Sequence, residues 1–413
     1  MSILYSIFAV CCLIIAFFLI LPFLMVLFSR LVGEKIKEIK ESDPDYKSYD
    51  FACIITAYRN AEIAKPLVQS LLRQKYQKHH IYLVADESDI STWDIEDERL
   101  MVLHPNPPLR LKAKSIIHAV DHFVRGHDYI AVFDADNLAH PDFLEEINKY
   151  ANNGCKAIQG QRTAKNLDTM YACADATGEF YKNFIDRYVP YLIGSSAVIS
   201  GSGMAVESTL YKAYLSSPEI EQGKHQWKKM LQEDKILQNN LLFKKEKISY
   251  AMQAIVYDEK VVSGEQVETQ RSRWLFSYFQ NLPNTSRLLL KGILGFNWNQ
   301  FIFGLVTVAP PMFIQLFLGL ILVIISFFID IRLSLLMGTA VFIFGLNILW
   351  VLYLSKVPRQ IWKAIWGLPF FVLKQFRGLL KMGNPNKNFK HSEHTRKVSI
   401  DDVLQSEKPN PQS

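Results

Sequence analysis

The chain has 413 residues, of which 49% are hydrophobic, and its 46 basic and 40 acidic side chains give a formal net charge of +6. This length accommodates one large soluble domain together with membrane segments. The mild positive charge lies mostly beside apolar segments, which suggests membrane orientation, and there are no interleaved basic and aromatic runs of the kind that grip nucleic-acid strands. Five scattered cysteines without CxxC spacing argue against a disulfide framework and fit a reducing compartment.

The first apolar segment comprises residues 1–30. No charged side chain occurs between Ile3 and Phe28, and about 20 apolar residues are enough for a helix to cross a bilayer. A secretory signal peptide would have a basic start and a shorter apolar run, whereas here the basic residues follow, in a polar linker at 31–48. Because basic residues mark the cytoplasmic side, we predict an uncleaved transmembrane anchor with its N-terminus outside and the following domain in the cytoplasm.

Residues 49–282 show the pattern of a soluble α/β domain. Predicted strands and helices alternate along it, at residues 51–57, 67–73, 80–85, 115–124 and 129–133. This alternation implies a parallel sheet, and ligands of such sheets bind outside the carboxyl ends of the strands. Asp86 and Asp134 both directly follow predicted strands, so both are candidate site residues.

The apolar pattern returns after the soluble domain. It predicts an interfacial helix at 283–297, transmembrane helices at 298–330 and 331–355, an interfacial helix at 356–382 and a polar, loosely ordered cytoplasmic tail at 383–413. Pro310 and Pro311 are expected to kink the first of the two transmembrane helices. The stretch 361–381 mixes aromatic and basic residues, which suits a helix in the interface better than a crossing helix. A crossing would place the basic tail outside, against the charge rule.

Two carboxylates follow the third predicted strand, in the run FDADN at residues 133–137. A nucleoside diphosphate needs its charge neutralised before it can leave, and oxygen ligands hold Mg²⁺ or Mn²⁺ for this purpose. Asp134 and Asp136 are therefore candidate metal ligands. Short acidic turns are also common at protein surfaces, so a solvated turn is the structural alternative.

Two further motifs have both a chemical and a structural interpretation. The run QED at residues 232–234 offers a general base for an acceptor hydroxyl, or acidic residues that complement a helix dipole. The run QRSRW at residues 270–274 offers arginine to phosphate oxygens and a flat indole to a sugar. Its structural alternative is a basic and aromatic membrane anchor.

Taken in order, an aspartate after the second strand, DAD, ED and QxxRW resemble the processive family-2 glycosyltransferases. These include the cellulose, hyaluronan, chitin and bacterial poly-N-acetylglucosamine synthases. The resemblance covers about residues 50–280 and the flanking membrane helices. It implies an α/β fold of the GT-A type, with a parallel-rich sheet flanked by transmembrane and interfacial amphipathic helices. It further implies metal-dependent, inverting transfer of a sugar from a nucleotide-sugar to a growing polysaccharide or a glycolipid. UDP-sugars are the favoured donors.

The resemblance also implies a role for each matching residue. Asp134 and Asp136 are expected to hold Mg²⁺ or Mn²⁺, and Asp234, with Glu233, is the catalytic base candidate. The expected donor contacts come from Thr56, Ala57, Tyr58, Asp86, Lys112 and Asp134. The expected contacts to diphosphate and acceptor come from Gln270, Arg273, Trp274, Gly201, Ser202 and Gly203. QED in place of TED, and ESDIS after Asp86, depart from the family pattern and leave the nucleotide open.

Three functions stay open on these grounds. QxxRW favours a processive synthase, whereas only three clear crossings favour a non-processive transferase acting on a lipid-linked acceptor, since a polymer channel needs surrounding protein. The intact acidic and basic motifs argue against a non-catalytic membrane subunit, and nearly apolar crossings argue against a transporter. His118 and His122 could form a metal pair, but a surface helix face is the simpler interpretation.

The resemblance and the apolar segments together predict the protein's surroundings. We expect a multi-pass protein of the inner (plasma) membrane with a cytoplasmic catalytic domain. Its expected partners are a nucleotide-sugar donor, a saccharide or lipid-linked acceptor and membrane lipids, and no nucleic acid. An oligomer or an accessory secretion subunit is left open.

Overall fold

The computed structural model of the protein describes residues 3–33, 36–39, 41–226, 232–380 and 398–407. The soluble domain is built on one mixed sheet with the strand order β3-β2-β1-β4-β7-β6-β8-β5. The strands are β1 (Phe51–Tyr58), β2 (His79–Asp86), β3 (Leu100–Leu103), β4 (Tyr129–Asp134), β5 (Leu138–Ala139), β6 (Ala157–Ala164), β7 (Met204–Glu207) and β8 (Ile248–Asp258). The predicted α/β fold class with a parallel-rich sheet is confirmed.

The parallel half of the sheet brings strand ends together. β1 pairs in parallel with both β2 and β4, and β2 pairs in parallel with β3. All eight residues of β2 are buried, which explains why these strands appear in the sequence as unbroken apolar runs. The register places Tyr58 opposite Asp86 and Thr56 opposite Asp134, so the predicted donor loop and both aspartates share one edge.

The other half of the sheet is mixed. β7 is antiparallel to β4 and β6, β6 is parallel to β8, and β5 is antiparallel to β8. The helices of this domain are α2 (Lys65–Leu72), α3 (Lys112–Asp121), α4 (Phe143–Asn152), α5 (Met170–Lys182), α6 (Val189–Leu192), α7 (Ser208–Leu215), α8 (Pro218–Gln226) and α9 (Glu233–Phe243). A π-helical turn, Asn183–Tyr188, joins α5 to α6. The predicted helices at 67–73 and 115–124 correspond to α2 and α3.

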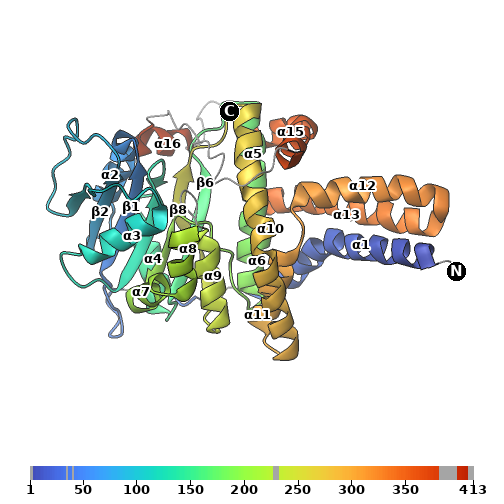
Figure 1. The fold of residues 1–413 in the computed structure, drawn as a ribbon, viewed down its shortest axis with the longest axis horizontal. Helices are drawn as coiled ribbons and strands as arrows, with labels where there is room; N and C mark the ends of the chain where they lie inside the picture. The colour runs from blue at the N-terminus through green and yellow to red at the C-terminus, as the bar shows by residue number, and fades with distance from the viewer. Residues whose placement is uncertain (1–2, 34–35, 40, 227–231, 381–397, 408–413) are drawn as a thin grey trace.

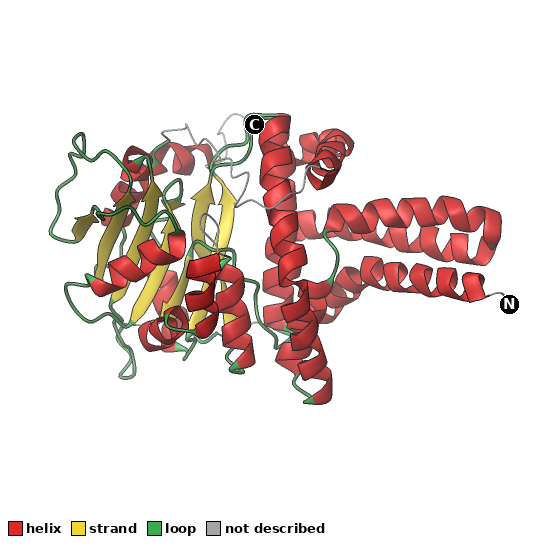
Figure 2. Ribbon diagram, in the orientation of Figure 1, coloured by secondary structure: helices red, strands yellow, loops and turns green. Residues whose placement is uncertain are grey.

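Three described helices are long and apolar enough to cross a membrane: α1 (Ile3–Ser29), α12 (Met312–Ile329) and α13 (Ile331–Leu354). They pack into a bundle that projects away from the sheet, with α10 (Gly264–Leu294) standing between the two (Figures 1 and 2). Leu19, Met337 and Phe344 fill the bundle interior and are at most 1% exposed. The bundle therefore has a packed interior and an apolar outer surface.

Two predicted segments differ in the structure. Residues 283–294 continue α10, so the boundary predicted at 282/283 lies inside one helix of 31 residues that contains Pro283. The predicted helix 298–330 is two helices, because Pro310 and Pro311 break it rather than kink it. Its first part, α11 (Trp298–Val308), turns back along α10 (Figure 1). Of the two parts, only α12 belongs to the bundle.

The C-terminal part also differs from the prediction. Residues 356–382 contain α14 (Arg359–Ala364), a 3-10 turn (Ile365–Gly367) and α15 (Leu368–Leu380). α15 packs along α10, outside the bundle (Figure 1). The predicted loose tail, 383–413, contains an ordered helix, α16 (Ile400–Glu407), whereas residues 381–397 and 408–413 lie outside the described part. Ile400 and Val403 are buried against Leu138 and Tyr257, which explains the order.

Two glycines allow α10 and α11 to approach closely. A Cβ at Gly304 would lie 2.6 Å from the Cα of Leu289, and a Cβ at Gly292 would lie 2.3 Å from the backbone nitrogen of Phe301. Since both obstacles are backbone atoms, we expect Gly304→Ala to destabilise this helix pair by about 1–3 kcal/mol. Thermal unfolding in detergent measures the effect. Gly178→Ala in α5, where the added Cβ meets nothing within 4 Å, is the control, and an equal midpoint for both variants would contradict the prediction.

Candidate active site

The predicted site residues of three strands meet at one edge of the sheet. Thr56, Ala57 and Tyr58 end β1, Asp86 ends β2 and Asp134 ends β4. The turn at Gly201–Gly203, which precedes β7, and the start of α9 lie against this edge. The sheet thus assembles residues that are up to about 180 positions apart in the chain, as the rule for parallel strands leads one to expect.

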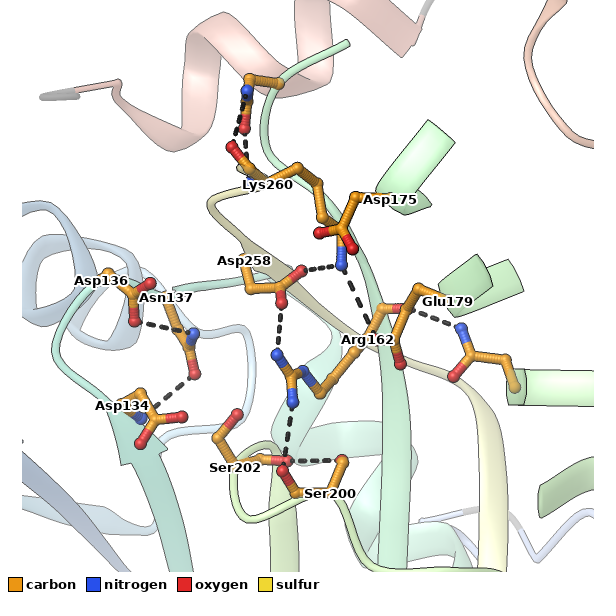
Figure 3. A network of polar contacts seen from close by, with 12 residues as sticks. Asp134, Asp136, Asn137, Arg162, Asp175, Glu179, Ser200, Ser202, Asp258 and Lys260 are labelled. Carbon is orange, nitrogen blue, oxygen red and sulfur yellow. Dashed lines mark hydrogen bonds and ion pairs between the residues drawn. The ribbon is translucent and has the colours of Figure 1, made fainter. Parts of the chain in front are cut away.

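The DAD turn is held in shape by Asn137. The Asn137 backbone nitrogen donates to the Asp134 carbonyl at 3.1 Å, and the Asp134 backbone nitrogen donates to Asn137 Oδ1 at 3.1 Å. Asn137 Nδ2 also donates to Asp136 Oδ1 at 3.4 Å (Figure 3). Asn137 is 1% exposed. Asn137 was not among the predicted site residues, although its place directly after DAD is a signal for this role, because asparagine often closes a tight turn.

Lys112, at the start of α3, links the predicted motifs. Its Nζ lies 2.6 Å from Asp134 Oδ1, 2.8 Å from the Gly201 carbonyl oxygen and 3.4 Å from Glu233 Oε1. Burial by itself would lower the pKa of Lys112, but the carboxylates of Asp134 and Glu233 outweigh burial and raise that pKa. Burial would likewise raise the pKa of Asp134, but Lys112 holds it below its usual range. The pair is therefore ionised.

Glu233 and Asp234 begin α9 beside this pair. Burial raises the pKa of Glu233 to about 7, with the charge of Asp234 adding to the effect and Lys112 opposing it. Lys112 Nζ is 3.4 Å from the Glu233 carboxylate but 2.6 Å from the Asp134 carboxylate. Its charge therefore stabilises the ionised form of Glu233 less than that of Asp134. Asp234 lies beside the glycine turn, since a Cβ at Gly201 would be 3.6 Å from the Cβ of Asp234.

A pH dependence follows from the raised pKa of Glu233. The ionised Glu233 competes with Asp134 for the charge of Lys112, whereas the protonated Glu233 does not. We therefore expect kcat/KM of the transfer reaction to fall as pH drops through about 7. A pH–rate profile tests this. Glu233→Gln should lose the limb near pH 7, and an unchanged limb in that variant would assign it to another group.

Asp86 has a structural role that the sequence analysis did not foresee. It is 2% exposed, and its two carboxylate oxygens accept hydrogen bonds from the backbone nitrogens of Leu109 and Arg110, at 2.8 and 2.6 Å. This loop leads directly into α3 and Lys112. Next to it, Glu87 pairs with Arg110 at 2.8 Å. Asp86 therefore positions the loop before Lys112, and a contact of Asp86 with the donor's base stays a prediction.

The QxxRW motif, with Gln270, Arg273 and Trp274, lies in the first third of α10. Arg271 pairs with Asp175 of α5, and its guanidinium lies 4.2 Å from the centre of the Trp274 ring. Trp274 is 39% exposed. Burial lowers the pKa of Arg273. α10 reaches the start of α9 through a hydrogen bond between Gln232 and Gln280. Arg271 and Trp274 contact Asp175 and Lys182 of α5, and the contacts of the motif with diphosphate and acceptor stay predictions.

The residues present fit a hard divalent cation. Asp134 and Asp136 offer carboxylate oxygens, and Mg²⁺ or Mn²⁺ typically takes one or two carboxylates together with substrate phosphates. Within the described ranges, no group of three or more His, Cys, Asp or Glu side chains gathers as a metal site, so the diphosphate would complete the ligand set. His118 and His122 lie with ring centres 4.2 Å apart and belong to no such group.

A buried charge network beside the site was missed by sequence reasoning. Arg162 of β6 forms an ion pair with Asp258 of β8, and Lys260 Nζ lies 2.7 Å from Asp258 Oδ1 and 3.8 Å from Glu179 Oε2 (Figure 3). Asp258, Lys260 and Glu179 are each at most 8% exposed. No motif spacing reveals this network, because its members come together only through the pairing of β6 with β8 and the packing of α5 beside them.

The comparisons with known proteins agree with this fold. The profile described as glycosyltransferase-like family 2 matches residues 49–277, and the chain therefore belongs to this family. It is a glycosyltransferase by family, with a GT-A-type fold. No curated protein sequence matches the chain.

Solved structures show the same fold at low sequence identity. A mannosyltransferase, PcManGT from Pyrobaculum calidifontis, determined with GDP-Man and Mn²⁺, is 12% identical and superposes with a TM-score of 0.56. That match covers 91% of this chain and 99% of the other. S. aureus TarS is 15% identical, and the match covers 58% of this chain and 40% of TarS. Its TM-score of 0.37 is too low to support a shared overall fold. The likeness to PcManGT extends the shared fold beyond the catalytic domain.

Proposed function

We propose that this protein is a membrane-anchored, inverting glycosyltransferase that uses a nucleoside-diphosphate sugar and Mg²⁺ or Mn²⁺. The observation that carries the proposal is the meeting of Lys112, Asp134, Glu233 and Gly201, with Asp234 beside them, at the carboxyl ends of the strands. One edge thus holds oxygen ligands for a metal, a cation for a diphosphate and a carboxylate for a hydroxyl proton. Transfer with inversion needs these three groups.

The roles of the chain's own residues follow from their positions. Thr56, Ala57 and Tyr58 border the place of the nucleotide, and Lys112 exchanges Asp134 for the donor's diphosphate. Asp134 and Asp136 would hold the metal, which neutralises the leaving diphosphate when bound. Asp234 accepts the proton of the acceptor hydroxyl as that oxygen attacks the anomeric carbon, and the nucleoside diphosphate leaves from the opposite side. Gly201, Ser202 and Gly203 border the acceptor, and Gly201 lies next to Asp234, because a Cβ at Gly201 would be 3.6 Å from the Cβ of Asp234.

A second candidate concerns the acceptor: single addition to a lipid-linked acceptor rather than growth of a secreted polymer. It is supported by the bundle of α1, α12 and α13, whose interior is filled by side chains such as Leu19, Met337 and Phe344. A polymer crossing the membrane would need a protein-lined path. PcManGT, which shares the fold over 99% of its length, was determined with GDP-Man, so GDP-sugars belong beside UDP-sugars in any test.

The proposed orientation places the catalytic domain in the cytoplasm. Arg30, Lys356 and Arg359 follow the domain-proximal ends of α1 and α13, whereas the far end of the bundle carries the short turn at Asp330. An excess of basic residues next to the domain supports a cytoplasmic domain. The exposed apolar surface of the three helices supports their insertion in a bilayer.

The experiment that tests this function is a donor screen. The full chain, purified in detergent with MnCl₂ or MgCl₂, is offered a panel of UDP- and GDP-sugars with lipid acceptors and native membranes added back. Release of nucleoside diphosphate with one donor, lost on chelation of the metal, supports a metal-dependent transferase and identifies the sugar. Product size then distinguishes single addition from polymer growth. No release from any donor would favour a non-catalytic subunit.

A further inference from the structure

The segment at residues 198–201 crosses the site as irregular backbone between α6 and β7. Each of its four carbonyl oxygens accepts a hydrogen bond from a different cationic side chain. The pairs are Arg187 Nε to Val198 at 3.2 Å, Lys235 Nζ to Ile199 at 3.1 Å, an Arg162 terminal nitrogen to Ser200 at 3.1 Å and Lys112 Nζ to Gly201 at 2.8 Å. These cations come from the π-helical turn, α9, β6 and α3, so side chains rather than a strand ladder hold this backbone.

Each of the four cations is itself fixed by a carboxylate. The ion pairs are Arg187 with Glu179 at 2.8 Å, Lys235 with Asp234 at 3.3 Å, Lys112 with Asp134 at 2.6 Å, and Arg162 with Asp258. Two of these carboxylates, Asp134 and Asp234, belong to the proposed reaction site. The other two, Glu179 and Asp258, lie behind it and are joined through Lys260 (Figure 3). The segment is therefore held from the site on one side and from a buried network on the other.

We propose that Arg162 is a positioning residue for the acceptor side of the reaction: anchored by Asp258, it holds the Ser200 carbonyl and thereby sets the Gly201 turn against Asp234. This inference rests on the proposed function. Arg162 is suited to the task because its guanidinium bridges two partners at once, the Asp258 carboxylate and the Ser200 carbonyl (Figure 3). Its side chain is 15% exposed, and a planar fork with several donors holds two such partners in a fixed geometry that the single ammonium of a lysine reproduces only in part.

The consequence of losing this bridge is specific to the acceptor. Ser200 is followed directly by Gly201, which packs on Asp234, so release of the Ser200 carbonyl shifts the acceptor turn relative to the base. A shift of about 1 Å in reacting groups lowers the rate by about 10²-fold. The donor side is built by β1, the DAD turn and Lys112. Among the described residues no hydrogen bond joins Arg162 to these groups, although its positive charge helps to lower the pKa of Asp134. Donor binding should therefore change little, and Asp258→Asn, which retains that charge, shows the effect of position alone.

The test compares Arg162→Gln, Arg162→Lys and Asp258→Asn with wild type in the full chain. Arg125→Gln is the matched control, because Arg125 pairs with Asp50 at 2.9 Å at the opposite end of the strands. Calorimetry measures binding of UDP or GDP with MnCl₂, and assays measure release of nucleoside diphosphate without acceptor and transfer with acceptor. Arg162→Gln is expected to lower acceptor kcat/KM by about 10²-fold while nucleotide binding and donor hydrolysis change by less than about twofold.

The remaining variants keep the outcome decisive. Arg162→Lys should recover part of the transfer rate. Asp258→Asn, which retains the guanidinium, should lower transfer and leave hydrolysis unchanged, as Arg162→Gln does. If Arg162→Gln does not fold, Asp258→Asn tests the proposal in its place. Equal losses of hydrolysis and transfer, or a loss matched by Arg125→Gln, would overturn the positioning role. If wild type neither binds nucleotide nor releases it from any donor, the proposed function itself fails, which is a separate result.

Discussion

Asp134→Asn is expected to remove sugar transfer almost completely, with kcat lowered by about 10³-fold or more, because loss of one preorganised charge at a reacting diphosphate costs on that order. The amide keeps the shape of the side chain but removes the negative charge that a metal needs and that Lys112 contacts at 2.6 Å. Lys112 then pairs with Glu233 alone. The measurement is nucleoside diphosphate release over a range of MnCl₂ concentrations.

The control for Asp134→Asn is Asp142→Asn. The Asp142 carboxylate forms an ion pair with Lys75 at 2.7 Å, and neither residue is a predicted site residue. It should retain wild-type kinetics and the same metal dependence. If Asp134→Asn were active at saturating metal with only its apparent metal affinity reduced, Asp134 would be one of several interchangeable ligands. If its activity were independent of metal and close to wild type, the metal site would have to lie elsewhere.

Asp234→Asn is expected to lower kcat by about 10²–10⁴-fold while donor affinity stays unchanged, since a positioned general base contributes this much to a proton transfer. Asp234 lies against the Gly201 turn, on the proposed acceptor side, and pairs with Lys235 at 3.3 Å. Steady-state kinetics give kcat, and calorimetry with UDP or GDP gives nucleotide affinity. The two values together separate catalysis from binding.

Glu233→Gln is the matched comparison for Asp234→Asn, because it changes the adjacent carboxylate of the same turn. It should alter the pH profile near pH 7 and retain more activity than Asp234→Asn at high pH. The opposite ranking, with Asp234→Asn within a few fold of wild type, would transfer the role of base to Glu233, whose raised pKa suits proton transfer near neutrality.

The parts of the fold that could be predicted from sequence are those with a strong local signal. β1, β2 and β4 are buried on both faces, so they appear as apolar runs, and the carboxylates that follow them mark the site edge. β5 has only two residues, and β6 carries Gln159, Gln161 and Arg162, so neither gives an apolar run. Lys112 and Asp134 could be assigned because each belongs to a recognisable motif.

The remaining features depend on contacts between distant positions. Arg162 and Asp258 are 96 residues apart, and only the register of β6 with β8 joins them. The four cations at residues 198–201 come from four elements, and no pattern in the chain connects them. The predicted boundary at 282/283 divides helix α10, because residues 283–297 were assigned to a separate interfacial helix. Packing against α11 and α15 instead keeps α10 continuous through Pro283.

Helix α16 had a local signal that polar composition concealed. Ser399 accepts a hydrogen bond from the Asp402 backbone nitrogen at 3.2 Å, and its own backbone nitrogen donates to Asp402 Oδ2 at 3.0 Å, which is the reciprocal arrangement of a capping box. Ile400, Val403 and Leu404 then follow at helical spacing. A tail judged only by its polar composition is thus assigned as loose although it contains one complete amphipathic helix.

The placement of α16 affects how the protein should be handled. Its Ile400 and Val403 cover Leu138 and Tyr257, and Leu138 follows Asp136 by two residues. A chain shortened before residue 398 would leave two large apolar side chains uncovered beside the candidate site and would favour aggregation. Expression trials therefore do better with the tail kept, and an affinity tag belongs beyond residue 407 rather than in place of this helix.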